Sequence, residues 1–141
     1  MKTLLTILCY ICIVCLFSCK PTFDPIDYGH DACMHCRMTI IDKRFAAEIL
    51  TDKGKAYKFD DLGCLLKYMS ENSLQQPNAK IFVANYAAPA NNFLDAHTAI
   101  YIHSELLKTP MNGNYAAFET EQKAIIPGST TINLLKWNDL K

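Results

Sequence analysis

Residues 45–69 read FAAEILTDKGKAYKFDDLGCLLKYM and decide the architecture of the first half of the chain. Apolar residues alternate along residues 45–49, as they do on one face of a strand. A polar turn ending in Gly54 comes next, and residues 56–59 then continue as a second short strand. Two strand patterns joined by a glycine-containing turn predict a β-hairpin.

A helix is predicted directly after this hairpin. Asp60 or Asp61 can cap its first turn. The next apolar residues recur at i, i+3, i+4 and i+7, at Leu62, Leu65, Leu66 and Met69. A break at residues 76–78, which contains a proline, precedes another strand pattern at residues 81–86. The first half of the chain therefore has the predicted order β-β-α-β.

The second half of the chain contains a similar set of pieces. Residues 99–103 and 114–118 have strand patterns, residues 119–124 fit a short helix, and residues 130–137 close the unit. The two halves share this order but little sequence. A duplicated β-β-α-β unit is therefore a hypothesis that periodicity alone does not settle.

The N-terminus has the pattern of an export signal. Lys2 precedes an apolar run at residues 3–17, which is shorter than the roughly 20 residues of a membrane-spanning helix. Residues 16–19, with the sequence LFSC, resemble the bacterial lipobox, which predicts cleavage before Cys19 and attachment of lipid to that cysteine. Several acyl chains would give lasting membrane attachment. An ordinary signal peptide and an uncleaved membrane anchor are the alternatives.

This interpretation divides the chain into three parts. Residues 1–18 are the signal peptide, residues 19–30 are the lipidated cysteine and a flexible tether, and residues 31–141 are the folded domain. The protein would face the periplasm of a bacterial cell envelope. Because Lys20 stands where inner-membrane lipoproteins often have aspartate, the outer membrane is slightly favoured.

Charge and motifs exclude several functions. The 14 basic and 14 acidic residues balance, and loss of Lys2 with the signal peptide leaves one acidic residue in excess. A nucleic-acid-binding protein would have a basic surplus, so nucleic acid is not expected as a partner. No Ser-His-Asp set, phosphate-binding glycine loop or carboxylate pair stands out, and we do not expect an enzyme.

Cysteine and methionine gather in one short segment. Residues 33–38, with the sequence CMHCRM, hold two thiols, two thioethers and an imidazole. Sulfur ligands favour Cu(I), whereas structural zinc needs a second Cys or His pair at matching spacing, which the later sequence lacks. Of the seven cysteines, only Cys33, Cys36 and Cys64 remain after the signal peptide and the lipidated residue are set aside. This odd number argues against a fully paired disulfide framework.

Three motifs resemble the NosL family, whose members are exported copper-binding lipoproteins named as accessory factors for nitrous oxide reductase. The motifs are Cys33-x-x-Cys36-x-Met38, Asp42-x-Arg44-Phe45-Ala46-Ala47, and Tyr57-x-Phe59-Asp60-Asp61-Leu62-Gly63-Cys64-Leu65. Residues 110–118 resemble a later Met-Gly segment of the family. Two departures stand out: Arg37 replaces the usual glycine, and Asn112 is inserted between Met111 and Gly113. The resemblance implies an α+β fold of two small β-β-α-β lobes packed together.

The resemblance also implies a site and a role. The expected ligands of Cu(I) are Cys33, Cys36, Met38 and Met111. The expected role is to hand Cu(I) to a copper-requiring exported protein, with nitrous oxide reductase as the candidate that the family name indicates.

The residues around these ligands have ordinary roles in this interpretation. His35 and Arg37 would tune the cysteines by their charge, Cys64 would be a small buried thiol, and Asp60 or Asp61 would cap the helix. Met38 could instead belong to the core.

Two competing functions use the same cysteines. Cys33 and Cys36 could form the redox pair of a thiol-disulfide oxidoreductase, although such a pair normally starts a helix and here a strand pattern comes after it. They could also form a structural disulfide in a surface lipoprotein without catalytic function.

Overall fold

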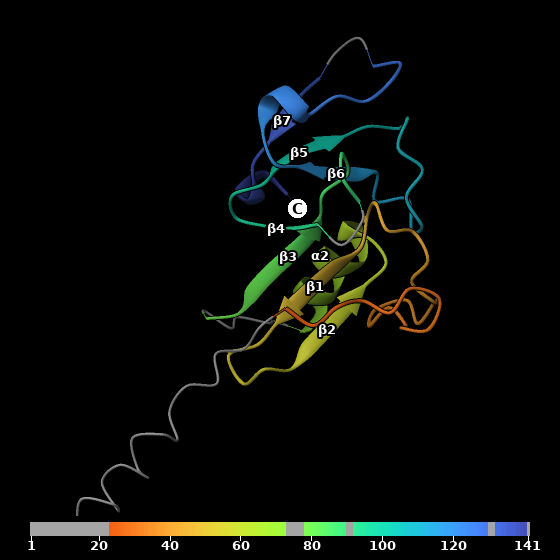
Figure 1. The fold of residues 1–141 in the computed structure, drawn as a ribbon, viewed down its shortest axis with the longest axis vertical. Helices are drawn as coiled ribbons and strands as arrows, with labels where there is room; N and C mark the ends of the chain where they lie inside the picture. Colours follow the sequence, from red (N-terminus) through yellow and green to blue (C-terminus); the bar gives the residue numbers. More distant parts are fainter. Residues whose placement is uncertain (1–22, 73–77, 90–91, 130–131, 141) are drawn as a thin grey trace, which may run out of the picture.

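The computed structural model describes residues 23–72, 78–89, 92–129 and 132–140. The predicted signal peptide, Cys19 and the first residues of the tether lie outside this part of the chain. Two antiparallel sheets are stacked along the long axis of the molecule, and one α-helix accompanies the first of them (Figure 1). The α+β class with two small lobes is confirmed. Among the described residues, no helix is long and apolar enough to cross a membrane.

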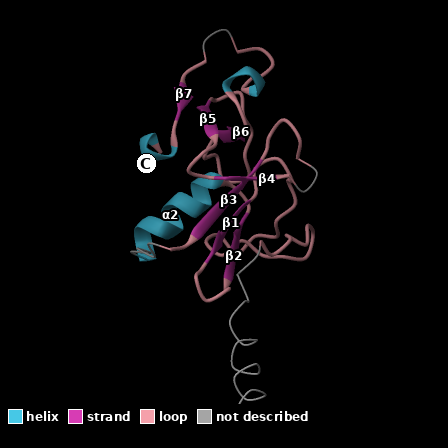
Figure 2. Ribbon diagram, turned by 60° about the vertical axis from the view of Figure 1, so that its left-hand side comes forward, coloured by secondary structure: helices cyan, strands magenta, loops and turns pink. Residues whose placement is uncertain are grey.

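The first lobe is built around the central strand β1. In chain order its elements are β1 (Ala47–Leu50), β2 (Ala56–Phe59), α2 (Leu62–Asn72), β3 (Lys80–Ala84) and β4 (Phe93–Asp95). The sheet order is β2-β1-β3-β4, with every neighbour antiparallel. The helix α2 lies along one side of this sheet (Figure 2). It begins where the sequence predicted, and its face with Leu62, Cys64 and Leu65 is buried.

The second lobe repeats the connectivity of the first in a smaller form. Its elements are β5 (Ile100–His103), β6 (Tyr115–Phe118), the 3₁₀ helix η1 (Glu121–Lys123), β7 (Leu134–Leu135) and a final 3₁₀ turn η2 (Trp137–Asp139). The order β6-β5-β7 corresponds to β2-β1-β3, because in each sheet the first strand pairs with both later ones. The hypothesis of two similar units is supported by this shared topology.

The buried apolar side chains form two hydrophobic clusters. The first cluster includes Phe59, Leu65 and Val83 of the first lobe and extends to Tyr101 and Ala117 of the second. The second lies mostly in the second lobe, where it includes Ile102, Leu107 and Ile126, and it also takes in Phe45 from the segment before β1. The lobes are joined along the strand ends, where the Tyr86 amide donates to the Ala117 carbonyl at 2.9 Å.

Three details differ from the sequence prediction. The helix expected at residues 119–124 is only the single turn η1, and the loop expected after residue 86 contains the extra strand β4. The predicted tether is also partly folded: Phe23 stacks against Phe82 and Phe93, and Ile26 is buried in the first core. These apolar side chains lose contact with water by packing on the sheet, which outweighs the loop-like composition around them.

Candidate metal centre

A tight turn at residues 33–38 presents the two predicted cysteines. The Cys33 amide donates to the Met38 carbonyl at 2.8 Å, and the Arg37 amide donates to the Cys33 carbonyl at 3.0 Å. Arg37 has a φ of 66°, in the left-handed region that favours glycine. Arg37 therefore has a backbone conformation that is costly for a residue with a side chain, and the turn contains some backbone strain.

The turn faces the start of α2, where two further donors lie. The atoms offered by Cys33, Cys36, Asp60 and Cys64 all lie within 4.8 Å of one another. Cys33, Asp60 and Cys64 are buried, and Cys36 is half-buried. All three cysteines are free thiols, so the structure does not contain the predicted alternative of a Cys33–Cys36 disulfide.

The carboxylate in this cluster is incompletely satisfied. The Cys36 thiol donates to Asp60 Oδ2 at 3.2 Å, while Asp60 Oδ1 is buried and has no hydrogen-bond partner among the described residues. A buried carboxylate oxygen normally has a partner because leaving it unpaired is costly. An unpaired acceptor beside three thiols is the arrangement that a bound cation would complete.

Burial holds the Cys36 and Cys64 thiols in the protonated form. It raises the pKa of Cys36 to about 11, with hydrogen bonding to Asp60 and Cys33 adding to the effect. Burial also raises the pKa of Cys64 far above its ordinary value, and the neighbouring Asp60 acts in the same direction. A metal that binds here must therefore displace protons, as thiolate sites generally require.

Sequence reasoning missed Asp60 and Cys64 as members of the site. Their local patterns predict ordinary roles, a helix cap and a core thiol. Their spacing could have indicated this role. Asp60 and Cys64 are four positions apart, so at the start of a helix they lie one above the other, about one turn apart. The linear sequence lacks a second pair of zinc ligands, but the fold supplies third and fourth donors in Cys64 and Asp60, so the absence of such a pair does not exclude zinc.

The cap of α2 is Asp61. Its Oδ1 accepts the Cys64 amide at 2.8 Å, as a residue capping the N-terminus of a helix does. Its Oδ2 accepts a second amide, that of Met111 from the second lobe, at 2.9 Å. Asp61 is fully buried.

The two residues predicted to tune the cysteines differ in position. His35 Nδ1 lies 3.7 Å from the Cys64 sulfur, and its Nε2 lies 3.3 Å from the Glu71 carboxylate. His35 therefore lies against the cluster. The Arg37 side chain is exposed and directs its guanidinium to the Met34 sulfur, at 3.8 Å.

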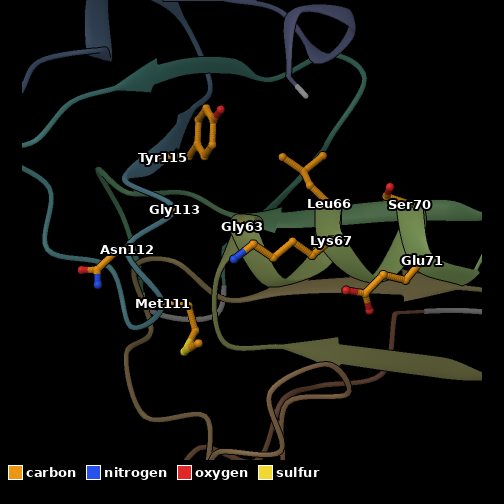
Figure 3. A pocket seen from close by; sticks show the side chains of 9 residues that line it. All are labelled: Gly63, Leu66, Lys67, Ser70, Glu71, Met111, Asn112, Gly113 and Tyr115. Carbon is orange, nitrogen blue, oxygen red and sulfur yellow. The ribbon is translucent and has the colours of Figure 1, made fainter.

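The two predicted thioether ligands also have different surroundings. The Met38 side chain is 54% exposed, so the alternative that it belongs to the core is wrong. Met111 is half-buried and packs against the first core cluster, which contains Cys33 and Cys64. Met111 also borders a cavity of about 330 Å³ between α2 and the second lobe, along with Gly63, Leu66, Glu71, Gly113 and Tyr115 among other residues (Figure 3).

Comparison with known proteins places this arrangement in a family. Residues 27–125 match the family model described as NosL. The chain belongs to the NosL family. A solved NosL structure, the copper chaperone NosL from Shewanella denitrificans, has the same fold, with a TM-score of 0.62 at 17% identity; the match covers 75% of this chain and 84% of that one. No curated protein matches the chain.

Proposed function

We propose that this NosL protein is an exported, lipid-anchored carrier of Cu(I) that gives its copper to a copper-requiring protein outside the cytoplasm. The observation that carries the proposal is the convergence of three free thiols and one oxygen of the Asp60 carboxylate within 4.8 Å. Copper is the cargo of such a protein and has no catalytic role in it.

The dimensions and chemistry of the cluster fit one soft cation. Two donors on one ion, each bound at about 2.3 Å, can be at most about 4.6 Å apart, so a separation of 4.8 Å needs little contraction. Thiolates prefer Cu(I), while the Asp60 carboxylate is a hard ligand that is less suited to this ion. Cys33, Cys36 and Cys64 are therefore the proposed anchors, and the Met111 and Met38 thioethers are candidate additional ligands.

The fold context favours carriage over redox catalysis. A redox Cys-x-x-Cys pair gains its low thiol pKa from the N-terminus of the helix that it begins. Here residues 33–36 lie in a turn, and burial raises the pKa of Cys36. A raised pKa disfavours the thiolate that disulfide exchange needs, but a metal can still displace the proton.

The test is competitive titration with Cu(I) and Zn(II) under anaerobic, reducing conditions. Alanine at Cys9, Cys12, Cys15 and Cys19 in the full chain leaves Cys33, Cys36 and Cys64 as its only thiols. We expect one Cu(I) per chain and a strong preference for Cu(I) over Zn(II). Cys64→Ser should weaken Cu(I) binding by 10-fold or more. Tight zinc binding with weak Cu(I) binding would refute the carrier function.

The anchor and the recipient need separate tests. In the native chain, Cys19→Ala should prevent lipid attachment and release the protein from the membrane fraction while leaving Cu(I) binding intact. Membrane fractionation then distinguishes the outer from the inner membrane. Nitrous oxide reductase is the proposed recipient on the basis of the family, and transfer of Cu(I) to its copper-free form is the direct measurement.

A further inference from the structure

One buried carboxylate connects the two lobes beside the metal centre. Asp61 is fully buried and comes from the first lobe. One of its oxygens accepts the Cys64 amide at 2.8 Å, and the other accepts the Met111 amide at 2.9 Å. The two amides belong to sulfur-bearing residues that are 47 positions apart in the sequence. Asp61 is therefore bonded to one candidate ligand residue from each lobe.

The backbones of the lobes touch next to this carboxylate. A Cβ atom added to Gly63 would lie 2.9 Å from the Gly113 Cα and 3.3 Å from Asp61 Oδ1. A Cβ added to Gly113 would lie 2.9 Å from the Gly63 Cα. Real Cβ atoms do not approach other atoms this closely, so both positions require glycine. The contact leaves no room for the Met111 turn to shift toward the helix.

The turn that carries Met111 is itself well defined. The Asn112 amide donates to the Thr109 carbonyl at 3.2 Å, and the Asn114 amide donates to Thr109 Oγ1 at 3.0 Å. Asn112, the inserted residue, has a φ of 55°, a left-handed conformation that asparagine tolerates. The insertion is thus accommodated within the turn, and the Met111 amide still reaches Asp61.

We propose that Asp61 is a positioning residue that holds Met111 on the copper site, so that the ligand set spans both lobes. This inference rests on the proposed function, because it assigns a role in binding the same Cu(I). Asp61 touches no metal in this scheme. It fixes the backbone of Met111 relative to that of Cys64, and the Met111 thioether is thereby offered to a cation held by the cysteines.

The test is a double-mutant cycle on Cu(I) affinity, in the full chain that keeps only the three described cysteines. Met111→Leu removes the thioether with little change in volume. Asp61→Asn keeps one side-chain oxygen as an acceptor. Its side-chain NH2 group replaces the other oxygen and cannot accept a hydrogen bond from the second backbone amide. Each change should weaken Cu(I) binding about 10-fold, the usual scale for groups that orient metal ligands. Because Asp61 acts through Met111, the double variant should be no weaker than either single one.

A spectroscopic measurement separates positioning from a general structural role. In selenomethionine-labelled protein, X-ray absorption should show a copper–selenium distance in the parent chain. In a Met38→Leu background, which removes the other candidate thioether, this distance should be absent in Met111→Leu and weak in Asp61→Asn, while the copper–sulfur distances remain. Asp42→Asn is the matched control, since Asp42 pairs with Arg44 in an exposed turn, and it should change neither signal nor affinity.

Several outcomes would overturn the inference. Unchanged affinity in both single variants, with normal Cu(I) binding by the parent, would leave the carrier function standing and remove the role of Asp61. Strictly additive losses would show that Asp61 acts independently of Met111. Should Asp61→Asn fail to fold, hydrogen exchange on the parent decides: an unprotected Met111 amide would refute the contact. No Cu(I) binding by the parent would overturn both proposals.

Discussion

The two lobes have the same strand connectivity but differ in the element that comes after their second strand. In the first lobe, β2 leads to the 11-residue helix α2 through Asp60 and Asp61. In the second lobe, β6 leads only to the three-residue turn η1. The strands therefore supply a common frame, while the metal donors depend on a long helix whose first turn is capped and buried.

The difference extends to polar burial. The first lobe buries Glu48, Asp60 and Asp61, whereas the corresponding strands β5 and β6 of the second lobe bury no acidic residue. Burying a carboxylate destabilises the fold, and these buried carboxylates are in the lobe that carries the candidate metal donors. The second lobe contributes to the proposed site only through Met111, on the turn before β6.

The largest expected effect comes from matched leucine truncations in the two cores. Leu65 in α2 is fully buried and Leu107 in the second lobe is 2% exposed. Each Leu→Ala change should lower the free energy of unfolding by about 3 kcal/mol in urea denaturation. Only Leu65→Ala should also weaken Cu(I) binding, because its neighbour Cys64 carries a donor. Equal losses of affinity would show that the lobes act as one unit.

The contact between the lobes can be broken at Gly63. Alanine usually stabilises a helix interior relative to glycine by about 0.5–1 kcal/mol. At Gly63 we expect the reverse, a destabilisation of about 2 kcal/mol, since the added Cβ meets the Gly113 backbone. Ser70→Ala, at an exposed position of the same helix, is the control and should be neutral or slightly stabilising. Thermal unfolding of both variants measures the difference.

Burial of Glu48 in the first lobe predicts that the stability of the protein depends on pH. Burial raises the pKa of Glu48 to about 7; the Asp24 amide, which donates to its carboxylate, acts in the opposite direction, as does Lys58. Because this folded-state value exceeds the unfolded one, its contribution to stability is present below about pH 4.5 and is lost as the pH rises through 7. Asp24 and Asp31 face the same group and add to the shift.

Glu48→Gln should remove this dependence. The variant should be on the order of 2 kcal/mol more stable than the parent at pH 8 and nearly equal to it at pH 4, because only the ionised carboxylate is costly to bury. Urea denaturation across this pH range gives the comparison. A variant less stable than the parent at pH 8 would contradict the assignment of a buried, ionising Glu48.

The smallest expected effect compares a lysine from each lobe. Lys58 is mostly buried and contacts Asp24, Asp31 and the Pro25 carbonyl. Lys58→Met should cost about 1 kcal/mol, because it leaves several acceptors without their cation. Lys123 pairs with Glu119 at the surface, and Lys123→Met should cost no more than about 0.5 kcal/mol. High salt should diminish the second effect more than the first.

The local pattern of the chain was sufficient for most of the fold. Alternating apolar residues predicted β1 and β2, and helical spacing with an acidic cap predicted α2, because these signals depend on neighbours in sequence. The local sequence predicted the short helices and strands after β3 less well. The turn η1 and the strand β4 depend on packing between segments, so composition could not separate them from a longer helix or a loop.

The sequence by itself determined the family motifs, the Cys33-x-x-Cys36 turn and the soft character of the donors, since residue type and spacing fix these. Only the tertiary structure decided that Cys64 and Asp60 complete the cluster and that Asp61 binds an amide from each lobe. The physical reason is that the contacts of the turn with Asp60 and of Asp61 with Met111 join residues 24 and 50 positions apart. They are made when the hairpin, the helix and the second lobe pack together, and no local pattern specifies that packing.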